Sequence, residues 1–102
     1  MQALTPAQAK RLRGLAHGLR PVLWIGRRGA TAAVLAAMEE ALLAHELIKV
    51  RLRDLPDRGA RRALLSELAD RTGSALAGAV GHTAVFYRPH PDPQRRRIDP
   101  TG

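Results

Sequence analysis

The sequence contains no cysteine and no long apolar run. The lack of cysteine excludes disulfide frameworks and cysteine-based zinc sites, and it fits a reducing compartment. No apolar stretch is long enough to span a bilayer, and residues 1–6 lack the basic-then-apolar layout of a signal peptide. A chain of 102 residues is long enough for one domain with its own core. We therefore expect a cytoplasmic, monomeric, single-domain protein without a membrane partner.

Aromatic residues are scarce, since Trp24, Phe86 and Tyr87 are the only three. Proteins that stack single-stranded bases on a sheet need exposed aromatic side chains. The composition offers few candidates for that role. If the chain binds nucleic acid, we expect contacts to phosphate and to overall shape to dominate.

Acidic residues are outnumbered, with nine Asp and Glu against 17 Lys and Arg and a net charge of +8. A small domain with this charge is attracted to polyanions, of which nucleic acid is the commonest. Lys10 and Lys49 are the only lysines; the other basic residues are arginine, which suits bidentate phosphate contacts. A G+C-rich genome would also enrich arginine over lysine, but it would not explain the excess of basic over acidic residues.

Signatures of catalysis and metal binding are absent from the sequence. The histidines have neither close helical spacing nor the ligand spacing of Cys/His sites; they are His17, His45, His82 and His90. There is no Walker lysine, no nucleophile elbow and no carboxylate pair at motif spacing. We therefore expect no enzymatic activity, cofactor, metal or small-molecule substrate.

Apolar spacing and capping residues predict three helices. The first begins at Thr5-Pro6-Ala7-Gln8, which has the form of a capping box, and runs to about Leu19. The second begins after Thr31 and ends near His45, and the third lies between Asp57 and Gly73. The apolar face expected for the first helix consists of Leu12, Leu15, Ala16 and Leu19.

Four strands are predicted between and after these helices. Residues 22–25 form a continuously apolar run, typical of a central strand covered on both faces. Residues 48–53 alternate strictly, with Lys49, Arg51 and Arg53 on one side. Residues 76–80 and 83–88 flank Gly81-His82 as a hairpin. The α-β-α-β-α-β-β order predicts an α/β fold, in which helices pack on a mixed four-stranded sheet.

The composition changes after residue 89. Pro91, Pro93 and Pro100 accompany a run of three arginines, Arg95 to Arg97. We therefore divide the chain into a domain at residues 1–89 and a flexible basic tail at residues 90–102. The tail acts either as a nonspecific anchor for a polyanion or as a purely solvated segment.

The main candidate site is Gly26-Arg27-Arg28-Gly29, which joins an apolar strand to the start of a helix. The glycines allow backbone N–H groups to approach a ligand. The helix start adds free N–H donors and the positive end of a dipole. The same pattern also suits a simple tight connection, and the two arginines at the tip favour the anion site.

Further basic residues extend this candidate interface. A stripe on the first helix consists of Lys10, Arg13, His17 and Arg20. Such stripes are often only solvated faces, and His17 equally suits a structural role. Lys49 joins the candidates from the alternating strand, ahead of Arg51 and Arg53.

Five segments in this order resemble the CRM domain family (chloroplast RNA splicing and ribosome maturation) in its bacterial, single-domain, YhbY-like form. The matching segments are Leu12-Arg13-Gly14-Leu15-Ala16-His17, Pro21-Val22 through Gly26-x-x-Gly29, His45-Glu46-Leu47-Ile48-Lys49-Val50, Thr72-Gly73 and Tyr87-Arg88-Pro89. The resemblance covers about residues 4–89. It differs between the glycines, where both residues are arginine and family members often have only one basic or polar residue.

The resemblance implies a fold similar to the C-terminal domain of bacterial translation initiation factor three. It also implies binding to ribosomal RNA in precursors of the large subunit, with the Gly-x-x-Gly loop as an RNA contact. Two other functions remain open from the residues: a DNA-binding or nucleoid protein, and a module that binds a protein on the ribosome.

Overall fold

Three helices and four strands alternate along the chain in the predicted order. The computed structural model describes residues 3–102, so Met1 and Gln2, which belong to the stretch judged unlike a signal peptide, lie outside the described residues. The elements are α1 (Pro6–Ala16), β1 (Leu23–Ile25), α2 (Ala32–His45), β2 (Leu47–Leu52), α3 (Arg58–Thr72), β3 (Ala75–Val80), β4 (Thr83–Tyr87) and the short 3-10 helix η1 (Pro93–Arg95). No helix in residues 3–102 has both the length and the apolarity to cross a bilayer.

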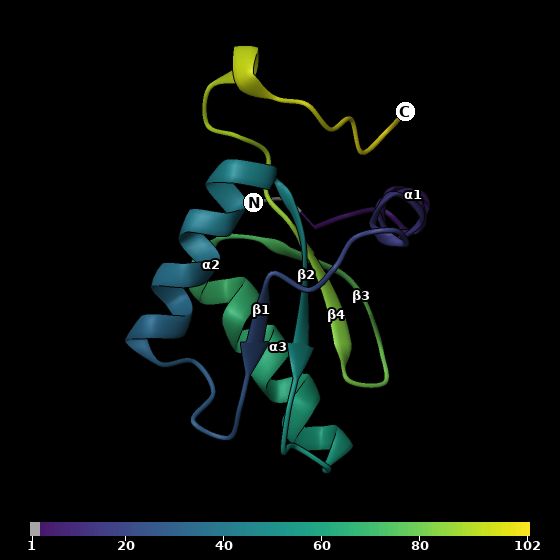
Figure 1. Ribbon diagram of the computed structural model, residues 1–102. Coiled ribbons are helices and arrows are strands. Elements are labelled where there is room, and N and C mark those ends of the chain that lie inside the picture. Colours follow the sequence, from purple (N-terminus) through teal and green to yellow (C-terminus); the bar gives the residue numbers. More distant parts are fainter. Residues whose placement is uncertain (1–2) are drawn as a thin grey trace.

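The strands form one mixed sheet in the order β1-β2-β4-β3. β1 runs parallel to β2, and β4 is antiparallel to both of its neighbours. Helices α2 and α3 cover one face, and α1 lies on the other (Figure 1). The predicted α/β class and sheet composition are confirmed. The expectation that residues 22–25 form a central strand is wrong, because β1 lies at the edge of the sheet.

The predicted helix boundaries hold where a capping residue defines them. Thr5 and Gln8 form the reciprocal capping box, with N···O distances of 3.0 and 3.1 Å. The side chains of Thr31 and Asp57 accept from Val34 N and Ala60 N. Only the end of α1 differs, at Ala16 instead of Leu19, because Gly18 and the residue preceding Pro21 disfavour helix there.

Two apolar clusters lie on opposite faces of the sheet. The larger packs α2 and α3 against Ile48, Val50 and Phe86, all fully buried. The smaller packs Leu12 and Ala16 of α1 against the other face. The expected apolar face of α1 is only partly buried, since Leu15 is 45% exposed and Leu19, beyond the end of the helix, is 40% exposed.

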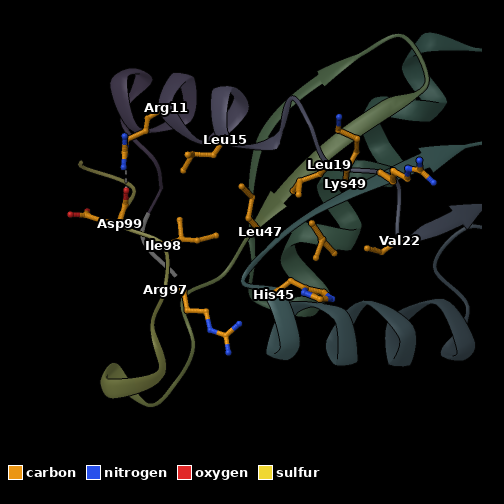
Figure 2. Close-up of a pocket in the computed structure, with 12 residues that line it drawn as sticks. Arg11, Leu15, Leu19, Val22, His45, Leu47, Lys49, Arg97, Ile98 and Asp99 are labelled. Carbon is orange, nitrogen blue, oxygen red and sulfur yellow. Dashed lines mark hydrogen bonds between the residues drawn. The ribbon is translucent and has the colours of Figure 1, made fainter.

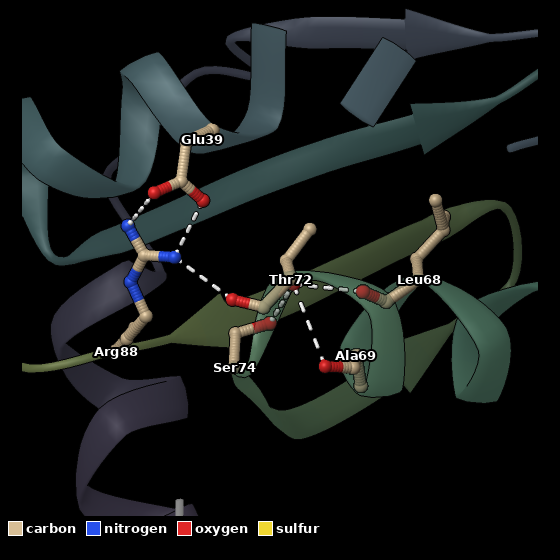
Figure 3. Close-up of polar contacts among 6 residues, drawn as sticks. All are labelled: Glu39, Leu68, Ala69, Thr72, Ser74 and Arg88. Atoms are coloured by element: carbon tan, nitrogen blue, oxygen red, sulfur yellow. Dashed lines mark hydrogen bonds and ion pairs between the residues drawn. The ribbon is translucent and has the colours of Figure 1, made fainter. Parts of the chain in front are cut away.

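Arg88, just after β4, connects three elements (Figure 3). Its guanidinium donates to both carboxylate oxygens of Glu39 in α2, at 2.6 and 3.0 Å, and to Thr72 O at the end of α3, at 2.8 Å. These hydrogen bonds and the positive charge of Arg88 hold the pKa of the Glu39 carboxyl below its ordinary value, against a smaller opposing effect of burial. Arg88 therefore fixes the middle of α2 and the end of α3 to the sheet.

The buried Glu46 holds the segment that the sequence predicts as a flexible tail. One carboxylate oxygen accepts from His90 N at 2.9 Å, and the other accepts from Arg97 N at 2.6 Å. Ile98 packs against the α1 cluster, and Arg11 Nε donates to Asp99 O at 2.8 Å. In the structure, residues 90–102 thus follow a defined path from the end of α2 back to α1 (Figure 1), which differs from the flexible tail expected. The domain division at residue 89 stays a prediction.

Replacing Arg88 with alanine should lower the free energy of unfolding by about 1–3 kcal/mol, because Thr72 O loses its charged donor. Glu39→Gln should cost less than about 1 kcal/mol, because Glu39 is half exposed. Urea denaturation at neutral pH measures both. The ionised Glu39 contributes to the free energy of unfolding at pH values above the ordinary carboxyl pKa. This contribution should disappear as the pH falls through the lowered pKa of Glu39. Equal stability of R88A and the wild type would contradict the role assigned to Arg88.

Truncation after Pro89 should lower the free energy of unfolding by about 2 kcal/mol or more, because it removes both donors from a buried carboxylate. Glu46→Gln is the matched variant in the full chain. The new side-chain NH2 group would face the N–H group of either His90 or Arg97, two donors without an acceptor. We therefore expect the free energy of unfolding to fall by about 1–3 kcal/mol. Chemical denaturation of both proteins provides the measurement. If the truncated protein is as stable as the full chain, residues 90–102 are the flexible tail that the sequence predicts.

Candidate nucleic-acid interface

The Gly26–Gly29 segment forms a tight turn between β1 and α2. Gly29 N donates to Gly26 O at 3.0 Å, which places Arg27 and Arg28 at the exposed tip. Thr31 N then donates to Gly29 O at 2.9 Å, and the Thr31 side chain caps α2. The strand-to-helix turn predicted from the sequence is therefore present, with both arginines directed to solvent.

The two glycines of the turn have different roles. Gly29 has φ +66°, a conformation that other residues rarely adopt, and a Cβ there would lie 3.2 Å from Leu64 Cδ1. Gly26 has no positive φ, and an added Cβ would meet no atom within 4 Å. Gly29 is thus required by the fold, whereas the fold alone does not require glycine at position 26.

Several backbone N–H groups in and after this turn are available to a ligand. Within residues 3–102, no hydrogen bond occupies the N–H groups of Arg27 and Arg28. The first N–H groups of α2 have no partner inside the helix, and only that of Val34 is capped by Thr31. Together with the positive end of the helix dipole, these donors suit an anion such as a phosphate.

The cations of β2 continue from the turn across the face of the sheet that carries α1. Lys49, Arg51 and Arg53 alternate with buried residues, so they share that face. Arg53 N donates to Ile25 O at 2.8 Å, immediately before Gly26. Alternate residues of a strand lie about 6.6 Å apart, so the row extends about 13 Å from the foot of the turn.

Trp24 lies beside this row and is 48% exposed. The guanidinium carbon of Arg53 is 4.0 Å from the centre of the indole ring, and that of Arg51 is 5.7 Å away. Both distances are within the range of cation–π attraction. Sequence reasoning missed Trp24, because the apolar run 22–25 was interpreted as covered on both faces. It ranked Arg51 and Arg53 below Lys49, because the segments that resemble the CRM family include Lys49 but not the other two.

Of the basic residues predicted as one stripe, Lys10, Arg13 and His17 keep helical spacing along α1 and its C-cap, whereas Arg20 lies beyond the helix. Lys49 Nζ donates to His17 O at 3.4 Å, so His17 borders the row on β2. Arg13 is exposed, but its Nη1 donates to Ala77 O at 2.9 Å and its stem lies over Gly78, so one of its five donors is used by the fold. Lys10 lies about two turns before His17, and Arg20 lies in the connection to β1.

Arg20 and Lys49 also border an apolar groove beside α1 (Figure 2). The groove has a volume of about 450 Å³. Leu15 and Ile98 point into the same space between α1 and the C-terminal segment (Figure 2). The exposed leucines of α1 and of the connection after it therefore face a groove with a cationic rim. No group of three or more His, Asp or Glu side chains in residues 3–102 could hold a metal ion.

Comparison with known proteins gives consistent matches over most of the chain. The CRS1/YhbY (CRM) domain matches residues 4–88. A Pseudomonas aeruginosa protein named a probable RNA-binding protein is 45% identical over 93 residues, which are 91% of this chain and 88% of that protein. A Haemophilus influenzae RNA-binding protein is 40% identical over 89 residues, 87% of this chain and 89% of that one.

A solved structure also has this fold. The solution structure of a Staphylococcus aureus protein, described as a candidate RNA-binding protein, superposes with a TM-score of 0.75 and 28% identity. The match covers 94% of this chain and 99% of the other. The topology that carries the turn and the basic row is therefore shared with a relative of low sequence identity.

The two glycines of the turn should respond differently to alanine. Gly29→Ala should lower the free energy of unfolding by about 1–2 kcal/mol, because it combines a strained φ with a close contact to Leu64. Gly26→Ala should change it by less than about 0.5 kcal/mol. Parallel urea denaturation of the two variants measures the difference. Equal costs would contradict the distinction between them.

Proposed function

The chain belongs to the CRS1/YhbY (CRM) domain family, and from this premise we propose that it binds RNA through the Gly26–Gly29 turn and the basic face of β2. The observation that carries the proposal is the turn itself: two exposed arginines lie beside unoccupied backbone N–H groups at the start of α2. The relatives named as RNA-binding proteins support the same ligand. The protein acts by binding, and none of these residues has a catalytic step.

Binding combines electrostatic capture with a close backbone fit. Arg27 and Arg28 contact phosphates, while N–H groups of the turn and of the first turn of α2 hold one phosphate oxygen. A similar Gly-x-x-Gly loop clamps backbone nucleotides in KH domains. Most of the affinity comes from counterion release and therefore falls steeply with salt.

The footprint continues from the turn to the end of α1. Lys49 and His17 adjoin each other, and Arg51 and Arg53 join them to the turn. Arg20 adds a cation at the edge of this surface, and Arg13 contributes its remaining donors. Lys10 extends the footprint furthest along α1.

The RNA is ribosomal, and the protein binds it as a monomer in precursors of the large subunit in the cytoplasm. This finer assignment rests on the CRM family resemblance, which implies association with such particles. Crosslinking in cells followed by sequencing of the attached RNA tests it, with the double variant R27A/R28A as the control for specific crosslinks. Reads enriched in large-subunit precursors support the assignment, and a signal spread over messenger and other RNAs contradicts it.

Two alternatives give distinct results in simple assays. A DNA-binding protein would prefer duplex DNA over structured ribosomal RNA in competition at fixed salt. A module that binds a ribosomal protein would remain associated with ribosomal particles after nuclease treatment. We expect RNA to compete better and nuclease to release the protein.

Replacing Arg27 or Arg28 with alanine should reduce the slope of log affinity against log salt by about one unit for each arginine, because each substitution removes one phosphate contact. Fluorescence anisotropy of a labelled ribosomal RNA fragment between 50 and 200 mM salt, roughly the range over which such slopes are read, provides the measurement. Arg62→Ala is the matched control, because it removes the same charge from an exposed position on α3, near the opposite edge of the sheet. An unchanged slope in R27A/R28A would exclude the turn from the interface.

A further inference from the structure

We propose that Trp24, together with the guanidinium of Arg53, forms a stacking site for one unpaired base of the bound RNA. The inference rests on the proposed function and deepens it. Phosphate contacts alone can form with paired and with unpaired RNA. A stacking site instead requires an unpaired nucleotide next to the phosphates held by the turn.

The first support is the unusual exposure of an aromatic side chain. Phe86 and Tyr87 are 0% and 2% exposed, whereas Trp24 is 48% exposed. Trp24 is therefore the one aromatic residue in the described part of the chain that can meet a ligand. Its exposure follows from the edge position of β1 and from α1, which packs mainly on β3, β2 and β4 and leaves this part of the sheet uncovered.

The second support is the arrangement of charge around the ring. Arg53 lies 4.0 Å from the ring centre and Arg51 5.7 Å away, so two planar guanidinium groups adjoin the indole. Bases stack on aromatic rings and on guanidinium planes alike. A base seated here would lie within reach of the cations of β2 and next to the Gly26–Gly29 turn, since Arg53 is hydrogen-bonded to Ile25.

The geometry also restricts the kind of base. A base inside an A-form helix is already stacked on both faces and cannot lie against a side chain. The site therefore takes a nucleotide from a loop, bulge or single-stranded end. The surrounding cations do not distinguish the four bases, so little base preference is expected.

The single tryptophan of the chain allows a direct test by intrinsic fluorescence. The full-length protein is titrated at low salt with an eight-nucleotide oligoadenylate and with an abasic oligomer that has the same ribose-phosphate backbone. We expect the adenylate to quench Trp24 fluorescence at saturation and the abasic oligomer to leave most of it unchanged. Equal fluorescence changes with both probes would overturn the stacking site.

Substitutions at position 24 provide the second measurement. Trp24→Ala should weaken adenylate binding by about 5- to 150-fold, the range expected for base–aromatic stacking, and should leave affinity for the abasic probe unchanged. Trp24→Phe keeps a smaller ring and should restore part of the loss. An equal loss for both probes would mean that Trp24 acts only through the position of Arg53 and would overturn the inference.

These outcomes are distinct from failure of the proposed function. If the wild-type protein binds both probes equally and with a steep salt dependence, RNA binding through phosphates stands and only the stacking site is lost. If the wild-type protein binds neither probe nor a ribosomal RNA fragment, the proposed function fails and the stacking site fails with it.

Discussion

The parallel pairing of β1 with β2 is the interaction on which the candidate interface depends. Its last hydrogen bond, from Arg53 N to Ile25 O at 2.8 Å, holds the foot of the Gly26–Gly29 turn against the strand that carries the cations. The same register sets Trp24 opposite Arg51. A shift of β1 by one residue along β2 would turn Trp24 towards α2 and α3, on the face opposite Arg51 and Arg53. The positions of the turn, of Trp24 and of the basic row on β2 thus all depend on the pairing of β1 with β2.

Local signals in the sequence were sufficient for most of the elements. Thr5, Thr31, Asp57 and Gly73 mark helix ends through contacts within a few residues, so the sequence contains the whole interaction. The alternation of residues 48–53 likewise predicts which side chains are buried. The turn at Gly26–Gly29 was identified for the same reason, because its hydrogen bond closes over three residues.

Contacts between distant residues were not predictable in this way. Glu46 pairs with backbone groups 44 and 51 residues away, so composition alone made residues 90–102 look flexible. Arg13 reaches Ala77 across 64 residues, which neither its charge nor its helical spacing indicates. Trp24 was assigned to a covered strand because the edge position of β1 depends on strand order, and a run of four apolar residues does not contain that information.

Helix α1 and the C-terminal segment meet on the same face of the sheet. Gln8 Nε2 donates to Thr101 Oγ1 at 3.2 Å, Arg11 contacts Asp99, and Ile98 packs into the cluster of Leu12 and Ala16. Helix α1 and the C-terminal segment cover that face together, because Ile98 packs against the cluster that α1 forms with the sheet. We therefore expect amide protons of the first helix and those of the last ten residues to exchange with solvent through one shared opening event. The sheet and its two other helices would stay closed during that event, since they have a separate core.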